Sequence, residues 1–289
     1  MEQSPNMPSH LVVEAISHHV PAACNGTWEL LIGGRTNITW ALRSANGGTD
    51  LVVKLYCGKT NNPLFPNNPL AEASLLRHLV GTALAPRLIC QVDTVDGLVN
   101  VYELIPGNRW GHDTASVAVM MRRLHSLDAP RDLRVVPDGS DELRTQTLYI
   151  LSNCANGGDL KGLEPQNNIA PSGQRVLIHG DIVPGNLICN ASGVHLIDWQ
   201  CPAIGDPCED IAVFLSPAMQ SLYRGISLSG VEKEQFLSSY AQPQITERYR
   251  ALAPWYHWRM AAYCQWQVEN GKTDYAPALL LELEALHKS

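Results

Sequence analysis

The chain has 289 residues, of which 45% are hydrophobic and 17% are charged, and its formal net charge at pH 7 is −7. This balance, without any long run of Lys and Arg, indicates a globular protein of one or two domains and argues against nucleic acids or anionic membranes as partners. No apolar run reaches the roughly 18 residues of a membrane span, and residues 1–10 lack the pattern of a signal peptide. We therefore expect a cytoplasmic protein.

The first third of the chain has the pattern of an antiparallel sheet, with short β-prone runs separated by Gly- and Asn-rich turns. The predicted strands cover residues 28–32, 38–43, 51–56, 87–93 and 98–105. Ahead of the last two, Asn68 supplies an N-cap and Pro69 a first-turn proline for a helix that runs through Leu79. This part is predicted to be a sheet in hairpin order carrying one helix.

The pattern changes to helical periodicity from about residue 112. Val117, Met120, Met121 and Leu124 recur at helical spacing in a segment flanked by Asp113 and Pro130. Residues 130–172 show no clear period, because clusters of Gly and Asn interrupt it. Short strands are predicted at 176–179, 186–190 and 194–198, and three or four helices follow from residue 207 to the end. We place a domain boundary at the change of pattern, between residues 1–106 and 107–289.

The chemically informative segments are H-G-D-I-V-P-G-N at residues 179–186 and L-I-D-W at residues 196–199. Asp181 lies just past a predicted strand end, on a loop that contains Gly and Pro, where a carboxylate can project into a cleft. Asn186 and Asp198 add one neutral and one anionic oxygen donor near neighbouring strand ends. Hard oxygen donors of this kind suit Mg²⁺, which takes its remaining ligands from phosphates and water.

Two other interpretations of these residues remain open. Asp and Asn are common in turns, so any one of them alone has an ordinary structural explanation. A zinc or iron site of a metallohydrolase could use His179, Asp181, His195 and Asp198. Strand alternation, however, places His195 and Asp198 on opposite faces, which argues against that site.

The two segments resemble the motifs of the aminoglycoside phosphotransferase and choline kinase family, distant relatives of the protein kinases. In that family the aspartate of H-G-D-x-x-x-x-N is the catalytic base, the asparagine binds metal, and the aspartate of I-D-W binds the metal on the nucleotide phosphates. These roles fall on Asp181, Asn186 and Asp198. Further matches lie at residues 124–130 and 205–212, and the resemblance runs from about residue 31 to residue 215.

The resemblance implies an α+β, protein-kinase-like bilobal fold that uses ATP and Mg²⁺. A small lobe of antiparallel sheet plus one helix, residues 1–106, would hold the nucleotide. A large, mainly helical lobe, residues 107–289, would carry the catalytic and metal loops and the acceptor. Lys54, on a predicted strand, corresponds to the lysine that neutralises the α- and β-phosphates, and Glu72 to the helix acid that pairs with it.

The remaining nucleotide contacts implied by the resemblance lie in two short segments. Gly33, Gly34 and Asn37 belong to the loop that takes the place of a glycine-rich phosphate cover, although this loop departs from the G-x-G-x-x-G of protein kinases. Glu103 and Ile105 would bind adenine through their backbone at the hinge.

The departures from protein kinases favour a small-molecule hydroxyl acceptor. H-G-D replaces H-R-D, D-W replaces D-F-G, and no A-P-E segment is present, so phosphorylation-controlled peptide docking has nothing to act on. The Gly-Gly-x-Thr-Asn type of loop is similar to that of choline, ethanolamine and thiamine kinases, which favours a cationic amino-alcohol. An aminoglycoside or other antibiotic as acceptor, and a nucleotide-binding pseudokinase scaffold, are the alternatives.

The acceptor site is expected on the helices near the C-terminal end. Aromatic faces and a carboxylate can hold an ammonium group, and the candidates are Trp255, Trp258, Trp266 and Glu269. The same tryptophans recur at helical spacing, so packing in a helix core is the alternative for them.

Overall fold

The computed structural model describes residues 6–32, 36–44, 47–57 and 61–289. The chain forms two compact units. The first unit comprises Met1–Asn62, Pro66–Asn108 and His195–Cys201, and the second comprises Pro63–Phe65, Arg109–Val194 and Pro202–Ser289. The first unit therefore contains the segment with Asp198, although this segment lies beyond the predicted boundary between residues 106 and 107.

A five-stranded antiparallel sheet forms the first unit, in the order β1-β2-β3-β5-β4. Its strands are β1 (Thr27–Leu30), β2 (Ile38–Arg43), β3 (Leu51–Leu55), β4 (Leu88–Thr94) and β5 (Gly97–Glu103). The five predicted strands are confirmed, with ends displaced by at most two residues.

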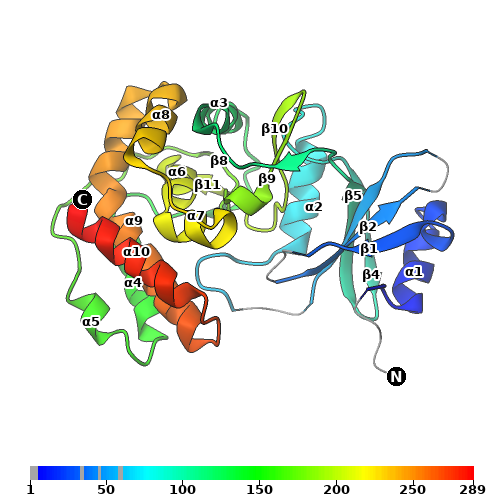
Figure 1. The fold of residues 1–289 in the computed structure, drawn as a ribbon, viewed down its shortest axis with the longest axis horizontal. Helices are drawn as coiled ribbons and strands as arrows, with labels where there is room; N and C mark the ends of the chain where they lie inside the picture. The colour runs from blue at the N-terminus through cyan, green and yellow to red at the C-terminus, as the bar shows by residue number, and fades with distance from the viewer. Residues whose placement is uncertain (1–5, 33–35, 45–46, 58–60) are drawn as a thin grey trace. The chain divides into compact units, whose positions relative to one another are not determined.

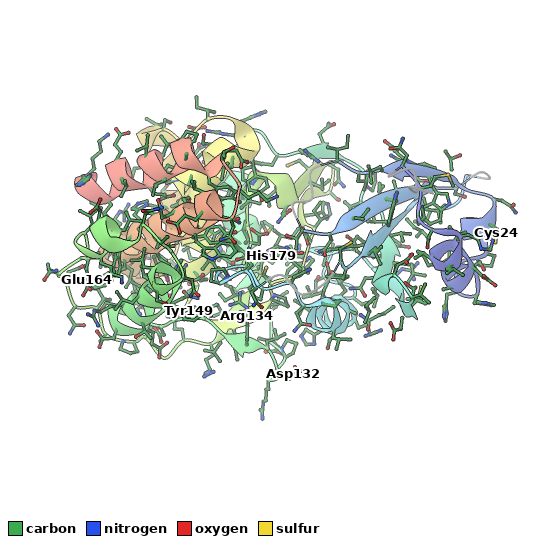
Figure 2. The ribbon with its side chains drawn as sticks, turned by 90° about the horizontal axis from the view of Figure 1, so that it is seen from below. Cys24, Asp132, Arg134, Tyr149, Glu164 and His179 are labelled. Carbon is green, nitrogen blue, oxygen red and sulfur yellow. The ribbon has the colours of Figure 1, made fainter. Side chains whose placement is uncertain are left out.

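Helices cover both faces of this sheet (Figure 1). Helix α2 (Pro69–His78) begins as predicted, because the Asn68 side chain accepts from the Ala71 N–H and Pro69 occupies the first turn. Helix α1 (His10–Ser17) and the 3₁₀ turn η1 (Pro21–Cys24) were not predicted, so the expectation of a single helix was wrong. Val12 and Ile16 of α1 pack into the core on the sheet face opposite α2. Cys24, at the end of η1, is exposed (Figure 2).

Two small three-stranded sheets follow. One has the order β10-β9-β6, and the other has the order β7-β11-β8. Their strands are β6 (Asn108–Arg109), β7 (Arg134–Val135), β8 (Val176–Ile178), β9 (Leu187–Asn190), β10 (Gly193–Leu196) and β11 (Ala203–Gly205). Strand β11 pairs antiparallel with β8 and parallel with β7. The segment between β8 and β9, with the 3₁₀ turn η2 (Pro184–Asn186), carries the H-G-D motif.

The second unit is mainly helical. Its helices are α3 (Thr114–Leu124), α4 (Ser140–Ser152), α5 (Gly158–Lys161), α6 (Cys208–Leu215), α7 (Pro217–Arg224), α8 (Gly230–Tyr240), α9 (Pro243–Glu269) and α10 (Tyr275–Lys288). Helix α9 carries Pro254 in its interior, and α4 and α10 pack against it. The predicted α3 is confirmed, with Asp113 as its N-cap. Helix α4 lies where no period was visible, and five helices rather than three or four follow residue 207.

The predicted α+β class, a unit of antiparallel sheet and a mainly helical unit, is thus confirmed. Across the described ranges, no helix combines the length and the apolar character needed to cross a membrane.

Candidate active site

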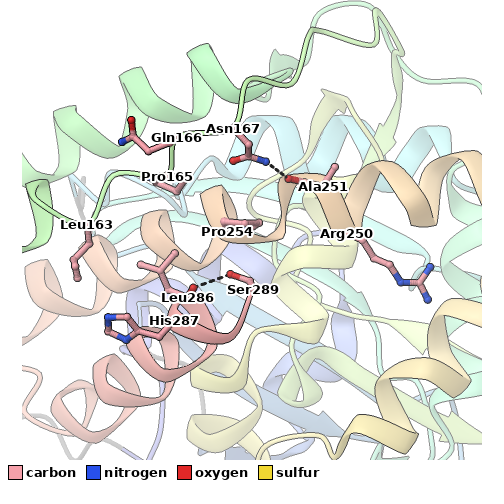
Figure 3. Close-up of a pocket in the computed structure, with 10 residues that line it drawn as sticks. All are labelled: Leu163, Pro165, Gln166, Asn167, Arg250, Ala251, Pro254, Leu286, His287 and Ser289. Atoms are coloured by element: carbon pink, nitrogen blue, oxygen red, sulfur yellow. Dashed lines mark hydrogen bonds between the residues drawn. The ribbon is translucent and has the colours of Figure 1, made fainter.

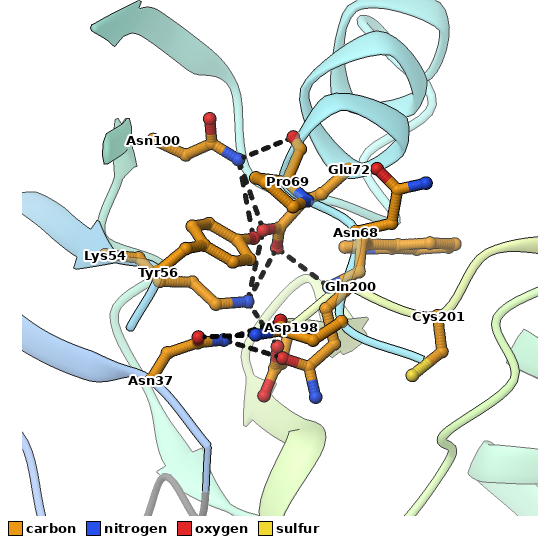
Figure 4. A network of polar contacts seen from close by, with 12 residues as sticks. Asn37, Lys54, Tyr56, Asn68, Pro69, Glu72, Asn100, Asp198, Gln200 and Cys201 are labelled. Carbon is orange, nitrogen blue, oxygen red and sulfur yellow. Dashed lines mark hydrogen bonds and ion pairs between the residues drawn. The ribbon is translucent and has the colours of Figure 1, made fainter. Parts of the chain in front are cut away.

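A buried charge cluster in the first unit brings together three predicted site residues. Lys54 on β3 points to the α2 side of the sheet, because its strand neighbours point into the core on the other face. Its Nζ lies 3.1 Å from both carboxylate oxygens of Glu72, in the first turn of α2. The same Nζ lies 2.5 Å from Asp198 Oδ1 (Figure 4).

The cluster holds one positive and two negative charges. The Lys54 and Glu72 side chains are 3% and 1% exposed, whereas that of Asp198 is 28% exposed. Burial alone would lower the pKa of Lys54, but the charges of Asp198 and Glu72 outweigh it and raise the pKa above its usual value. Lys54 therefore stays protonated, and Asp198 is the carboxylate of the cluster that solvent cations can approach.

Further hydrogen bonds fix the Glu72 carboxylate. Asn100 Nδ2 donates to Glu72 Oε2 at 3.3 Å, and the backbone N–H of Trp199 donates to Oε1 at 3.0 Å. Asp198 has a positive φ of 62°, an uncommon conformation for a residue with a side chain. The Trp199 bond places Asp198 directly beside the lysine that it contacts.

In the second unit the loop between β8 and β9, the predicted catalytic loop, holds Asp181 next to Asn186. Asn186 Nδ2 donates to the Asp181 carbonyl at 2.9 Å and to its Oδ2 at 3.2 Å, and both residues are buried. Gly180 has a φ of 80°, which glycine adopts without strain. Both bonds use the amide nitrogen of Asn186. Its amide oxygen, the kind of donor that a hard cation needs, takes no part in them.

Asp210, at the start of α6, anchors this loop. Its carboxylate is fully buried and accepts from the backbone N–H groups of His179 at 2.9 Å and Gly180 at 2.8 Å. His125 Nε2 lies 3.1 Å from the same carboxylate, and Tyr240 OH lies 2.7 Å from His125 Nδ1. In the sequence, His125 and Asp210 lie within the matching segments 124–130 and 205–212, and no role was predicted for either residue. Their part in holding the loop depends on contacts between residues far apart in the chain.

Among the predicted phosphate-loop residues, Gly33 and Gly34 lie outside the described residues. Asn37 is described, and its side chain contacts protein groups. Its Nδ2 donates to Gln200 Oε1 at 2.8 Å and to Asn67 Oδ1 at 3.0 Å. The structure therefore brings Asn37 to the segment that follows Asp198.

The predicted hinge residues lie at the end of β5 and just beyond it. The Glu103 N–H donates to the Arg87 carbonyl at 3.0 Å, and the Glu103 carboxylate pairs with the Arg87 guanidinium. Ile105 is half-buried. Adenine binding at these two residues stays a prediction. Because the Glu103 N–H already donates to Arg87, the backbone group of Glu103 that could bind adenine is its carbonyl.

Two of the predicted acceptor residues are buried in α9. Trp258 is fully buried, and its Nε1 donates to the Leu160 carbonyl at 2.6 Å. Trp255 is 4% exposed, and its Nε1 donates to the Asn167 carbonyl at 3.0 Å. These contacts agree with helix-core packing, the alternative that the sequence left open beside substrate contact.

Trp266 belongs to a different aromatic group. It is half-buried and stacks on Tyr263 with ring centroids 6.0 Å apart and an interplanar angle of 20°. Tyr263 in turn makes edge contacts with Phe65 at 5.1 Å and Tyr275 at 5.9 Å. We call these four residues the aromatic cluster.

Glu269, the predicted acceptor carboxylate, caps a turn. It accepts from the backbone N–H groups of Ala155 at 2.5 Å and Asn156 at 2.9 Å, and from Gln265 Nε2 at 2.7 Å. The carboxylate thus joins the C-terminal end of α9 to the turn that follows α4. Contact with a cationic acceptor stays a prediction for this residue.

His195, the other histidine of the alternative zinc site, has Nδ1 2.8 Å from the Ala83 carbonyl. Within the part of the chain that the structure describes, no group of three or more His, Cys, Asp and Glu side chains is arranged to hold a metal ion.

A separate pocket of about 520 Å³ lies in the second unit (Figure 3). Leu163, residues 165–167, the interior of α9 at residues 250–254 and the C-terminal end of α10 line it, with Asn167 donating to the Ala251 carbonyl at 2.8 Å. Its ten lining residues include none of the predicted site residues.

Comparison with known proteins assigns the chain to a family. The sequence profile of the phosphotransferase enzyme family matches residues 27–255. No sequence among the curated proteins matches the chain. A Plasmodium vivax ethanolamine kinase structure has a TM-score of 0.63 at 14% identity, covering 92% of this chain and 83% of that one. A choline kinase from Cryptosporidium parvum has a TM-score of 0.63 at 15% identity, covering 97% of each chain.

A spectinomycin phosphotransferase, solved in complex with ADP and spectinomycin, has a TM-score of 0.57 at 14% identity, covering 96% of this chain and 98% of that one. These likenesses confirm the protein-kinase-like bilobal fold. The family profile covers most of the chain, including Lys54, Glu72, Asp181, Asn186 and Asp198. The chain is therefore a small-molecule kinase that belongs to the phosphotransferase enzyme family.

Proposed function

We propose that the chain transfers the γ-phosphate of ATP, with Mg²⁺, to the hydroxyl group of a small cationic amino-alcohol. The observation that carries this proposal is the cluster of Lys54, Glu72 and Asp198. A buried lysine fixed by a helix acid, beside a partly exposed aspartate, is the arrangement with which kinases bind nucleotide phosphates.

Lys54 would bind the nucleotide phosphates. Its raised pKa keeps the ammonium charged, and Glu72 holds it from the side of α2. Nζ contacts two oxygens of Glu72 and one of Asp198, and phosphate oxygens would compete with Asp198 for Nζ. A related fold solved with ADP, the spectinomycin phosphotransferase, supports a nucleotide in this role.

The donor groups fit a magnesium ion. The cluster around Lys54 has an excess of one negative charge, and the Asp198 carboxylate is its exposed member. The family resemblance implies a second metal ligand, the amide oxygen of Asn186. Both proposed ligands, Asp198 and Asn186, would then supply hard oxygen donors. When bound, Mg²⁺ would neutralise charge on the phosphates of the nucleotide.

Asp181 would act as the base. The proton of the acceptor hydroxyl passes to the Asp181 carboxylate while its oxygen bonds to the γ-phosphorus, and the bond between that phosphorus and the leaving ADP oxygen breaks. Asn186 orients the carboxylate through the 3.2 Å bond to Oδ2, and Asp210 fixes the backbone that precedes it.

The aromatic cluster supports a cationic acceptor. Its half-buried member, Trp266, stacks on the buried Tyr263 and offers a ring face, and a cation–π contact contributes about 0.5–2 kcal/mol. The net charge of −7 adds long-range attraction for a cation. Two of the similar structures are named as choline and ethanolamine kinases. Phosphorylation of an antibiotic is the second candidate, supported by the likeness to the spectinomycin enzyme.

A screen for ADP release tests the proposal. Purified protein with Mg·ATP is given choline, ethanolamine, thiamine, aminoglycosides, spectinomycin and neutral sugars in separate assays. We expect turnover with an amino-alcohol and little with neutral sugars. Turnover only with antibiotics would establish the second candidate. Nucleotide binding without any transfer would contradict both and favour a scaffold.

A further inference from the structure

Three side-chain amides in the first unit form one hydrogen-bonded group, which we call the amide latch: Asn37, Asn67 and Gln200 (Figure 4). Asn37 Nδ2 donates to Asn67 Oδ1 at 3.0 Å and to Gln200 Oε1 at 2.8 Å. In return, Asn67 Nδ2 donates to Asn37 Oδ1 at 2.8 Å. Both amide hydrogens of Asn37 and its carbonyl oxygen are therefore used inside the latch.

The latch joins three segments that are remote in sequence. Asn37 lies immediately before β2, where the connection from β1 ends; Asn67 lies 30 residues later, and Gln200 lies 163 residues later. Gln200 is buried and comes two residues after Asp198. The latch thus ties Asn37, the residue before β2, to the segment that presents the proposed metal ligand.

Two more bonds dock the same segments. The Asn68 N–H donates to the Gln200 carbonyl at 3.1 Å, and Cys201 Sγ donates to the Pro66 carbonyl at 3.1 Å. Asn68 is also the N-cap of α2, the helix that carries Glu72. The latch is therefore continuous with the cluster around Lys54, and it attaches Asn37, the residue before β2, to that cluster.

We infer that Asn67 and Gln200 are positioning residues for nucleotide binding, acting through Asn37. They hold the end of the β1–β2 connection in place beside the Asp198 segment before the nucleotide arrives. This inference rests on the proposed function, because it assigns that connection to the nucleotide phosphates. It also gives the Asn37 side chain a role in the latch, in addition to the place of this residue in the predicted phosphate loop.

The physical reason lies in the ordering of the chain. Fixing the backbone of a residue costs about 1–2 kcal/mol, so a connection that must be ordered on binding weakens affinity. Asn37, which the latch already holds in place, does not carry that cost. A single neutral hydrogen bond changes an equilibrium by about 2- to 12-fold, which sets the size of the expected effect.

A double-mutant cycle tests whether Gln200 acts through Asn37. Gln200→Met keeps the length of the side chain but removes the acceptor, and Gln174→Met, at an exposed position of the second unit, is its matched control. We expect Gln200→Met to raise the Kd for Mg·ATP about 3- to 10-fold and the control to leave it unchanged. In an Asn37→Ala background the same Gln200 substitution should have almost no further effect.

Asn67→Leu completes the test and is expected to behave as Gln200→Met does. In steady-state assays the latch variants should raise KM for ATP more than they lower kcat, since they leave the Asp181 loop intact. An equal loss from Gln200→Met in both backgrounds would overturn the inference, because Gln200 would then act directly on metal or nucleotide. No change in either background would also overturn it.

Hydrogen exchange of the nucleotide-free protein separates the latch from the proposed function. The Leu31 N–H donates to the Thr39 carbonyl at 2.8 Å across the β1–β2 connection. Gln200→Met should accelerate exchange at Leu31 without lowering the overall melting temperature by more than the control does. Unchanged exchange would refute the holding role. If the wild-type chain bound no nucleotide, the proposed function and the nucleotide role would both fail, whatever the exchange result.

Discussion

The charge cluster of the first unit and the catalytic loop of the second unit are stabilised in different ways. Lys54 is held by opposite charges on two carboxylates, at 3.1 Å and 2.5 Å. Asp181 is held by hydrogen bonds: the Asn186 amide donates to its side chain, and the backbone N–H groups of the two preceding residues donate to Asp210. Removing a charge should therefore disturb the cluster, whereas the loop should respond to changes in hydrogen-bond geometry. Variants of the two regions should separate nucleotide binding from turnover.

The largest effect on turnover is expected from Asp181→Asn. The amide is nearly isosteric but cannot accept the hydroxyl proton, and general base catalysis contributes about 10²- to 10⁴-fold. The first unit is untouched, so calorimetry should give a Kd for Mg·ATP close to that of the wild type. An unchanged kcat would remove Asp181 from the mechanism.

Truncating the tryptophans of α9 separates core packing from acceptor contact within the second unit. Trp258→Ala should lower the free energy of unfolding by about 3–5 kcal/mol, because its indole is fully buried and hydrogen-bonded. Trp266→Ala should be less destabilising, because the side chain is half-buried, and should raise KM for a cationic acceptor about 2- to 30-fold.

Melting temperature and acceptor KM, measured on both tryptophan variants, distinguish the two roles. Trp255→Ala is expected to follow Trp258→Ala, since its indole is also buried. A Trp266→Ala variant with a normal acceptor KM would rule out the proposed contact with the aromatic cluster.

Asp210→Asn tests whether hydrogen bonds position the catalytic loop. The amide replaces one accepting oxygen by a donor, which opposes the N–H groups of His179 and Gly180. We expect a loss of stability of about 1–3 kcal/mol and a lower kcat, with a smaller change in KM for ATP. Chemical denaturation and steady-state kinetics measure both quantities. Normal kcat in the folded variant would show that the loop does not depend on this carboxylate.

The smallest effect is expected at a surface charge pair in the second unit. Hydrogen bonds from Arg224 and from the Ser229 N–H lower the pKa of Glu232 to about 2, from its usual value of 4.5. The group therefore adds stability above about pH 4.5, and that contribution disappears as the pH falls toward 2. Because the Glu232 side chain is 33% exposed, Glu232→Gln should cost less than about 1 kcal/mol at pH 7.

Denaturation of the wild type and of Glu232→Gln at several pH values checks this expectation. The difference in unfolding free energy should shrink between pH 4.5 and pH 2. A difference that persists at pH 2 would mean that the pKa is not lowered by folding.

Local signals in the sequence were sufficient for much of the fold. Alternating apolar residues located the strands of the first sheet, and Asn68 with Pro69 located the start of α2. These signals depend on neighbours in the chain, so they survive without tertiary information. The Asp181 and Asp198 segments were likewise found because each motif is contiguous.

Helices that are short or have an interrupted apolar stripe were missed. Helix α1 has only eight residues, and only Val12 and Ile16 of them are buried. Helix α4 buries Leu143, Thr147 and Ile150, and the polar threonine interrupts its apolar stripe. Such helices depend on the surface against which they pack more than on their own pattern.

Polar contacts between distant segments were also beyond the sequence. Asn37 was predicted to lie in the phosphate loop, and its side-chain partners, Asn67 and Gln200, lie far from it in the sequence. Asp210 lies within a matching motif, but the motif does not indicate that its carboxylate accepts from the backbone of the predicted catalytic loop. An amide or a carboxylate gives no periodic signal that identifies its partner, so these contacts require the folded structure.

Calorimetric titration of ATP, with and without Mg²⁺, into the wild type and Asp198→Ala tests the central claim most directly. Asp198 is the exposed carboxylate beside Lys54, so Mg²⁺ should tighten ATP binding to the wild type and not to the variant. Metal-free ATP should bind the variant at least as well as the wild type, because Lys54 has lost a competing anion. An equal gain from Mg²⁺ in both proteins would contradict the assignment of Asp198 as the metal ligand.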